Sequence, residues 1–394
     1  MGFPNPMRNV AVRSLTASIV MAAPLLTVTG EARVTVATSV VFQAGIGGYD
    51  VYRIPAIVRT PSGILVAFAE GRHTTSDTGN VDIVARRSFD GGTTWLAQRV
   101  VTNHGSDTAG NPTVMVDPAS GDIVLLSCRN GGALTEAQIM QGQASAATTR
   151  RVYVQRSADN AVTWSAPVEV TTVKDAGWRW YATGPGHGVA KQAAPHAGRL
   201  VVAANHSKPP AGSDTGTENK YYGAHSIYSD DGGVTWQVGF TSSATNGYVN
   251  ENESTVAELP DGRLYFSARG QNDTAPGTRA DAISVDGGQT LERAYRPQAT
   301  ITTPVVEGSV LALPDGRLLY SGPSHPTDRA AMAIRVSEDD GRTWTIGHQV
   351  SGLPAAYSDM VLMDGAVGVL YETGDFGPNE TITFTSVPIA EIRG

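Results

Sequence analysis

Short apolar runs recur along the chain, each close to a turn rich in Gly, Pro or Asp. The clearest runs are Ile64–Ala69, Ile123–Leu126, Leu200–Ala204, Leu264–Ala268, Leu318–Ser321 and Val367–Tyr371. They are too short for helices, and no sustained 3.6-residue periodicity connects them. Short runs separated by this turn chemistry predict an all-β protein.

An eight-residue pattern is repeated five times between these runs. The copies are Ser88–Trp95, Ser157–Trp164, Ser229–Trp236, Ser284–Leu291 and Ser337–Trp344. The central Asp and Gly predict an Asx-type turn with a positive φ, closed by Ser and Thr hydrogen bonds, and the last residue is a packing anchor. Successive copies start 53 to 72 residues apart, a spacing that suits four-stranded propeller blades better than a helical solenoid. With six turn-then-strand segments, we predict a six-bladed β-propeller.

The N-terminus has the pattern of a secretion signal at residues 1–32. Arg8 and Arg13 form a basic start, Leu15–Leu26 is apolar, and small residues follow. The apolar stretch is too short and interrupted to span a bilayer. We therefore expect a secreted protein whose single domain, 33–394, works as a monomer. A disordered N-terminal tail is the alternative.

Bulk composition narrows the function. A net charge of −8 argues against nucleic acid as a partner. Cys128 is the single cysteine, so no intrachain disulfide can form, and its apolar surroundings indicate a buried residue. The eight His residues have no ligand spacing, so we expect no metal and no cofactor. Only four of the 29 basic residues are Lys; an excess of Arg suits carboxylate recognition, although codon bias produces the same excess.

Three arginines lie where solvated residues are not expected. Arg53 stands inside an apolar strand, and Arg269 and Arg329 lie at the ends of two others. Strand ends on one face of a propeller converge on its axis, so together these residues would form a positive pocket for one carboxylate. Each of them taken alone is better explained as an ordinary solvated or salt-bridged arginine.

Further motifs follow one another along the chain. They are Tyr52–Pro55 (YRIP), Phe68–Arg72 followed by Asp77, Asn250–Leu259 (NENESTVAEL), Ala356–Asp359 (AYSD) and Leu370–Glu372 (LYE). In this order, and with repeated turns similar to Asp boxes, the chain resembles the exo-α-sialidases (neuraminidases) of the bacterial and animal type. The resemblance covers essentially all of 33–394 and implies a glycoside hydrolase acting on sialylated glycans.

The resemblance assigns roles to individual residues. It implies a carboxylate-binding triad of Arg53, Arg269 and Arg329, the acid/base Asp77, the glutamate base Glu253, the nucleophile Tyr357, and Glu372 bracing Arg53. Glu251 and Glu258 are alternatives for the base. A tyrosine is a sensible nucleophile here because the substrate carboxylate repels a carboxylate nucleophile, and sialidases are known to use one.

Weaker assignments concern the rest of the sugar. Glu70 and Arg72 are expected at the ring hydroxyls or the amide-bearing face, and Asn111 resembles a segment lining the N-acetyl pocket. An aromatic rim is expected from Trp178, Trp180 and Tyr181.

Taken together, these features predict a retaining exo-α-sialidase with a tyrosine-bound intermediate. Three alternatives remain open from the sequence. The propeller could bind sialoglycans without catalysis, act on a deaminated nonulosonic acid by the same mechanism, or transfer the sugar as a trans-sialidase.

Overall fold

The computed structural model describes residues 1–4, 36–243 and 246–394. The chain divides into two units, Met1–Arg33 and Val34–Gly394, and every described strand lies in the second. From residue 5 onward, the predicted secretion signal at 1–32 lies outside the described residues. Within the described ranges, no helix is long and apolar enough to cross a membrane.

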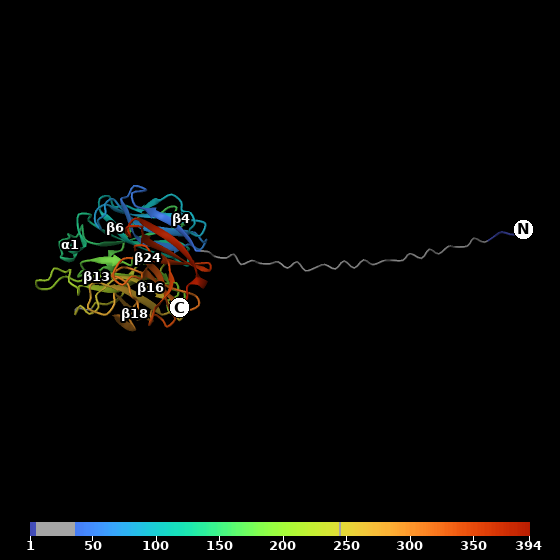
Figure 1. Cartoon of the computed structure of the whole chain (residues 1–394). Coiled ribbons are helices and arrows are strands. Elements are labelled where there is room, and N and C mark those ends of the chain that lie inside the picture. Colours follow the sequence, from blue (N-terminus) through green and yellow to red (C-terminus); the bar gives the residue numbers. More distant parts are fainter. Residues whose placement is uncertain (5–35, 244–245) are drawn as a thin grey trace. The chain divides into compact units, whose positions relative to one another are not determined.

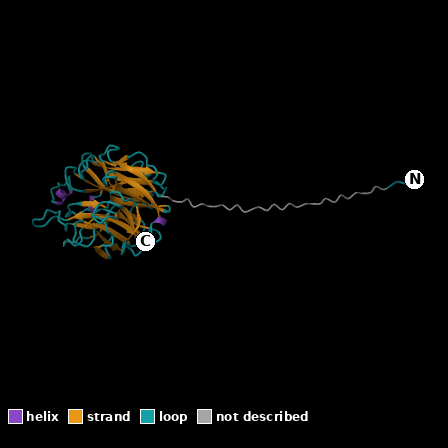
Figure 2. Cartoon of the chain, in the orientation of Figure 1, coloured by secondary structure: helices purple, strands orange, loops and turns teal. Residues whose placement is uncertain are grey.

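Strands make up nearly all of the regular secondary structure of the second unit, and loops connect them (Figure 2). Its first sheet joins β1 (Ala37–Gln43) to β24 (Ala355–Met363), β25 (Ala366–Thr373) and β26 (Thr381–Pro388). β1 pairs antiparallel with β26, so strands from the two ends of the unit close the same sheet. The all-β prediction is confirmed.

Four further sheets follow. The largest contains β2 (Val51–Arg59), β3 (Leu65–Arg72), β4 (Val81–Ser88), β5 (Arg99–Thr102), β6 (Thr108–Val116), β7 (Ile123–Asn130), β8 (Arg151–Ser157), β9 (Val168–Glu169) and β11 (Gly186–His187). The next contains β10 (Tyr181–Thr183), β12 (Val189–Ala190), β13 (Leu200–Ser207), β14 (Tyr222–Ser229) and β15 (Gln237–Thr241). The last two contain β16 (Glu251–Glu258), β17 (Leu264–Gly270), β18 (Arg279–Ser284) and β19 (Arg293–Pro297), and then β20 (Ser309–Ala312), β21 (Leu318–Pro323), β22 (Met332–Ser337) and β23 (Thr345–Gln349).

The sheets are arranged around a common centre, as in a β-propeller. β2 contacts β6 and β24, β6 contacts β10, β10 contacts β16, and β20 contacts β16 and β24, which closes a ring of inner strands. In Figure 1, β16 and β24 lie toward the middle of the body, whereas β4 and β18 lie toward its edge. Side chains at one end of the inner strands are therefore brought together.

The number of sheets differs from the sequence prediction. We expected six separate sheets, one for each blade, but the hydrogen-bonding pattern divides the unit into five. The reason is a single parallel bridge, Val81 to Thr108, which joins β4 to β6 and merges two groups of strands into the nine-stranded sheet.

Each repeated turn lies at the same place, after the third strand of an antiparallel group. In the first copy the Ser88 hydroxyl donates to Asp90 Oδ1 at 2.8 Å and accepts from the Gly92 amide at 2.8 Å. The Thr94 amide and hydroxyl donate to the Asp90 carboxylate at 2.9 and 2.6 Å. The other copies repeat this pattern, so the predicted side-chain closure of the turn is confirmed.

The helical content is small. α1 spans Glu136–Met140, and two 3₁₀ turns cover Thr171–Val173 and Ile389–Glu391. α1 lies in the long connection between β7 and β8. Cys128 is 1% exposed, as its apolar surroundings predicted.

Candidate active site

Four inner strands are irregular where a candidate residue lies. The pairing register shifts between Arg53 and Ala56 in β2, Gly110 and Thr113 in β6, Glu251 and Ser254 in β16, and Ala355 and Ser358 in β24. A β-bulge re-aims side chains and bends the strand. The bulges therefore allow Arg53, Asn111, Glu253 and Tyr357 to line one pocket rather than follow the regular alternation of their strands.

Two bulged residues have a strained backbone. Ile54 has φ 59° and Asn111 has φ 54°. The left-handed region is costly for a β-branched residue and more tolerable for Asn. Ile54 is held by packing against Val306, Ala356 and Tyr357. Strain of this kind clusters at functional sites because surrounding contacts must maintain it.

The three arginines predicted to form a triad meet around one phenol. The guanidinium carbons of Arg53 and Arg329 lie 5.2 and 5.7 Å from the centre of the Tyr357 ring. Arg269 Nη1 donates to the Tyr357 hydroxyl at 3.0 Å. Within the described part of the chain, no carboxylate forms an ion pair with Arg329. The pocket thus has concentrated positive charge and a guanidinium available to an anionic ligand.

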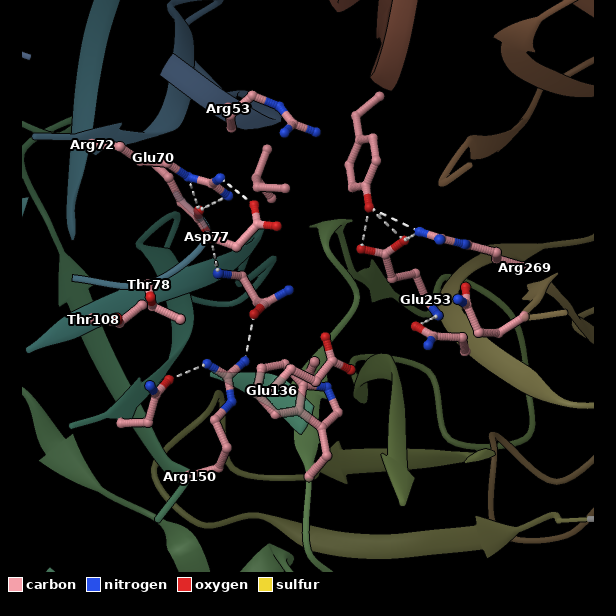
Figure 3. Close-up of a pocket in the computed structure, with 18 of the residues that line it drawn as sticks. Arg53, Glu70, Arg72, Asp77, Thr78, Thr108, Glu136, Arg150, Glu253 and Arg269 are labelled. Carbon is pink, nitrogen blue, oxygen red and sulfur yellow. Dashed lines mark hydrogen bonds and ion pairs between the residues drawn. The ribbon is translucent and has the colours of Figure 1, made fainter. Parts of the chain in front are cut away.

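Tyr357 forms a close pair with Glu253, which is labelled beside Arg269 in Figure 3. The Tyr357 hydroxyl lies 2.7 and 2.8 Å from the two carboxylate oxygens of Glu253. Glu253 also accepts from Arg269 at 2.7 Å. The alternatives lie elsewhere, because Glu251 accepts from Ser242 and Glu258 pairs with Lys191.

Burial raises the pKa of the Tyr357 phenol well above its usual value, and the negative charge of Glu253 adds to this effect. The positive charges of Arg269 and Arg53 act in the opposite direction. The phenol is therefore neutral at rest. Its proton can pass directly to Glu253 when a developing positive charge draws electrons from the oxygen.

Glu372 fixes the position of Arg53. The Arg53 Nε donates to Glu372 Oε1 at 2.7 Å, and the Ile54 amide donates to the same oxygen at 2.8 Å. The Tyr357 amide donates to the other oxygen at 3.2 Å. Glu372 is completely buried, so one carboxylate fixes both the first arginine and the backbone that carries the phenol.

Asp77 lies on the opposite wall beside Arg72 (Figure 3). Arg72 Nη1 donates to Asp77 Oδ1, and the Asp77 side chain is 83% exposed. Partial burial raises the pKa of the Asp77 carboxyl, but the positive charge and hydrogen bond of Arg72 outweigh it, and the pKa is lowered overall. Asp77 is thus ionised in the free protein.

A second polar chain extends from Arg72 along the pocket. Arg72 Nε and Nη2 donate to Glu70 Oε2 at 2.9 and 2.6 Å, and the Asn111 amide donates to the other Glu70 oxygen at 2.8 Å. Arg150 donates to the side chains of Asn111 and Asn130. Glu70 and Arg72 are fully buried, so their heads form a rigid wall rather than mobile surface groups.

The aromatic rim is only partly as expected. Trp180 lines the pocket, and Arg150 stacks on its ring at 3.9 Å. Trp178 instead stacks on His206 at 3.9 Å, and Tyr181 is 0% exposed in the same apolar cluster. Their predicted place on the rim is wrong, because Tyr181 on β10 is buried in this cluster and Trp178, which precedes β10, packs against it.

Several pocket residues were not found from the sequence. They are Thr78, Thr108, Asn130, Leu134, Glu136, Arg150, Ala182, Tyr222, Asn252 and Gln271. Polar residues in a polar connection give no sequence periodicity, so Glu136 and Arg150 carried no recognisable signal. Among the described residues, no group of three or more His, Cys, Asp or Glu side chains is placed to hold a metal ion.

Comparisons with known proteins agree with this geometry. Residues 63–369 match the family described as a BNR repeat-like domain. A sialidase from Micromonospora viridifaciens is 33% identical over 350 residues, covering 83% of this chain and 50% of that protein. An exo-alpha-sialidase from Aspergillus fumigatus is 31% identical, covering 84% of this chain and 80% of its own length. The chain thus spans half of one relative and most of the other.

Solved structures of a sialidase and a trans-sialidase also superpose on this chain. The Hadza microbial sialidase Hz136 superposes with a TM-score of 0.76 at 28% identity, covering 89% of this chain and 68% of that one. A leech intramolecular trans-sialidase superposes with a TM-score of 0.73 at 18% identity, covering 90% of this chain and 70% of that one, which supports the fold alone. The family match covers most of the chain, and the Aspergillus fumigatus relative is 31% identical with 80% of its length covered. The chain therefore belongs to the sialidase family.

Proposed function

We propose that this protein is a retaining exo-α-sialidase that hydrolyses terminal α-linked sialic acids of glycoproteins, glycolipids or oligosaccharides. The observation that carries the proposal is the meeting of three guanidinium groups around the Tyr357 phenol, whose hydroxyl is hydrogen-bonded to Glu253. A pocket of this kind suits a sugar with a carboxylate on its anomeric carbon.

The arginines bind the substrate carboxylate and orient the ring. Arg53 is held through Nε by Glu372, which leaves its terminal nitrogens for the ligand. Arg329 has no ion pair with a described carboxylate, so a substrate carboxylate is its natural partner. The bound anion then lies beside the phenol, where a carboxylate nucleophile would be repelled but a neutral tyrosine is not.

In the first step, the Tyr357 oxygen forms a bond to the anomeric carbon while the glycosidic C–O bond breaks. The phenolic proton passes to Glu253, 2.7 Å away, and Asp77 protonates the departing oxygen. In the second step, Asp77 takes a proton from water, the water oxygen bonds to the anomeric carbon, and the phenol is released with its proton returned from Glu253. Two displacements at one carbon give net retention.

Asp77 must be protonated before it can act as an acid. In the free protein the charges of Arg72, Arg53 and Arg329 lower the pKa of this carboxyl. A substrate carboxylate on the arginines neutralises part of that charge, and the bound sugar removes water from Asp77. Both effects raise its pKa, so substrate binding itself prepares the acid.

We propose, in addition, that the strands group into six blades. The proposal is supported by the two antiparallel sets β2–β3–β4–β5 and β6–β7–β8–β9, which one bridge connects. It is also supported by the inner strands β2, β6, β10, β16, β20 and β24, each of which contacts the next in a closed ring.

We further propose that the protein is secreted after removal of residues 1–32 and that 33–394 works as a monomer. The support for secretion is the basic and apolar pattern of the N-terminus. N-terminal sequencing of the protein collected from the medium tests the first point. Light scattering during gel filtration tests the second.

The central experiment is hydrolysis of sialosides of defined linkage, followed by proton NMR. We expect the α-anomer of free sialic acid to appear first and then mutarotate, because retention gives this order. Initial release of the β-anomer would contradict the double displacement, and the appearance of a new sialoside instead of free sugar would indicate transfer. Binding without any turnover would favour a glycan-binding role.

A further inference from the structure

A second pocket adjoins the active site at Arg150. It is a hollow of about 370 Å³, lined by the connection between β7 and β8 and by the segment 169–179. Arg150, which is labelled on the active-site wall in Figure 3, lines both pockets. None of the steps proposed for sialoside hydrolysis uses this second pocket, which we call the Lys174 pocket after one of its cations.

The charged side chains of the Lys174 pocket are predominantly cationic. Four basic and two acidic residues line it: Arg150, Arg151, Lys174, Arg179, Glu169 and Asp175. Glu169 is neutralised by Arg151 Nη1 at 2.9 Å, and the Asp175 carboxylate accepts from the Gly177 amide at 2.7 Å. The pocket therefore carries an excess of positive charge that its own carboxylates do not balance.

Lys174 is a half-buried cation without a counter-ion. Its side-chain Nζ donates to Thr149 Oγ1 at 3.2 Å and to the Arg150 carbonyl at 3.4 Å. Within the described ranges, no carboxylate forms an ion pair with Lys174. An ammonium group has three donors, so one donor of Lys174 remains for a ligand in the pocket.

The surroundings of Lys174 favour a bound anion. Burial, followed by the positive charges of Arg150 and Arg179, lowers the pKa of Lys174 to about 8, and Cys128 acts in the opposite direction. An anion beside the amine would favour its charged form and raise its pKa. The protonation of Lys174 therefore depends on whether the pocket is occupied.

Arg179 supplies a second cation without a counter-ion. It forms no ion pair with a carboxylate of the described part of the chain. An added Cβ at Gly142, which has φ 81°, would lie 2.9 Å from the Arg179 guanidinium carbon, so glycine allows the guanidinium to approach the backbone closely. The Arg179 amide donates to the Ser207 carbonyl at 2.8 Å, and the neighbouring Trp178 stacks on His206. These contacts fix the backbone that carries Arg179.

We propose that the Lys174 pocket binds an oxyanion group, such as the sulfate or carboxylate of an acidic glycan, between Lys174 and Arg179. Ammonium and guanidinium groups are strong donors to oxyanions. This site is separate from the pocket that holds the substrate in the proposed hydrolysis, and it gives an acidic glycan a second point of attachment. It goes beyond the proposed sialidase function, and its binding can be measured without turnover.

The test measures acetylation of lysine side chains by limiting acetic anhydride at pH 8, followed by mass spectrometry of the peptides. At this pH about half of the Lys174 amines are neutral and reactive. Bound sulfate should move the pKa of Lys174 toward the ordinary lysine value of about 10.4. The acetylation rate of Lys174 should then fall at least about fivefold and saturate with sulfate concentration. Chloride at the same ionic strength is the salt control, and Lys208, a half-buried lysine outside the pocket, is the internal control.

Arg179→Gln should remove the protection by sulfate, with each protein compared with its own rate in the absence of sulfate. Glucuronic acid should protect Lys174 and methyl glucoside should not, because only the former carries a carboxylate. Protection by sulfate alone would support the site and restrict its ligands to sulfated or phosphorylated groups.

An unchanged acetylation rate of Lys174 in sulfate would overturn the proposal. Equal protection by chloride or by methyl glucoside would also overturn it, as would protection that persists in Arg179→Gln. The measurements on the wild type are decisive even if Arg179→Gln does not fold. Protection of Lys174 in a protein that does not hydrolyse sialosides would contradict the sialidase function and still support this site.

Discussion

The repeated turns and the pocket are both held by side-chain hydrogen bonds, but over very different separations along the chain. In the turn Ser88–Trp95, Asp90 is bound by Ser88 and Thr94, two and four residues away. In the pocket, Tyr357 meets Glu253 across 104 residues, and Arg53 meets Glu372 across 319. The turns depend on neighbours in the chain, whereas the pocket exists only when the ring of strands is closed.

The pKa values of the carboxyl groups also differ between the turns and the pocket. The hydrogen bonds from Thr94 lower the pKa of the Asp90 carboxyl to about 2, and each turn keeps its acid ionised. In the pocket, nearby carboxyls shift in opposite directions, because arginines lower the pKa of Asp77 and burial raises that of Glu136. Groups with pKa values moved apart are typical of a site that transfers protons.

The largest expected effect concerns the pocket. Tyr357→Phe should reduce kcat for a fluorogenic sialoside at least about 10³-fold, the scale on which loss of a nucleophile is measured. The fold should be retained, since the ring still packs. Tyr371→Phe, also buried in the same sheet, is the matched control and should remain active. Comparable activity of both variants would remove Tyr357 from the mechanism.

The loss of activity caused by Asp77→Asn should depend on the leaving group of the substrate. For a natural disaccharide linkage, which needs a proton on the departing oxygen, we expect a loss of about 10²- to 10⁴-fold in kcat/KM. An aryl sialoside with an acidic phenol should lose far less in its first step. Rates measured for a series of aryl sialosides test this. A loss independent of the leaving group would mean that Asp77 only orients the substrate.

A substitution in a repeated turn should lower the stability of the protein and leave its activity unchanged. Asp90→Asn replaces a carboxylate that accepts from Ser88 and Thr94, and should lower the free energy of unfolding by about 1–2 kcal/mol. Activity at 25 °C should be unchanged. Denaturant unfolding and sialoside hydrolysis on the same sample measure both.

The same variant has a predicted acid dependence. Because the folded pKa of Asp90 is lowered to about 2, its contribution to stability is full above the ordinary carboxyl pKa. It is lost as the pH falls toward about 2. The difference in Tm between wild type and Asp90→Asn should therefore shrink on acidification below about pH 4. A constant difference would show that the turn carboxylate acts only through its shape.

The smallest effect should come from the second copy of the turn. Ala161 has φ 62°, where the first and third copies have Gly92 and Gly233 at φ 88° and 90°. Ala161→Gly removes strain of about 1–2 kcal/mol but increases the entropy of the unfolded chain by about 0.4–1 kcal/mol. We expect a net stabilisation below about 1 kcal/mol, measured by denaturant unfolding. Gly92→Ala, the reverse change, should destabilise strongly because an added Cβ would clash with Phe384.

Much of the fold follows from local features. The Asp, Gly and Trp of each turn, with the apolar runs beside them, were sufficient to predict strands, turns and a propeller. The number of sheets was not predictable, because the bridge between Val81 and Thr108 depends on how two neighbouring groups of strands approach each other. The places of Trp178 and Tyr181 were missed for a related reason: an aromatic residue has the same local pattern on a rim as in a core.

The sequence by itself determined the repeat, the all-β class, the family and the identities of the groups around Tyr357. Only the tertiary structure decided that Glu253 rather than Glu251 reaches the phenol, that bulges re-aim it, and that Glu136 lines the same pocket. The physical reason is range: a turn is closed by hydrogen bonds between residues a few positions apart, whereas the charge and burial around a pocket are summed over strands from the whole chain.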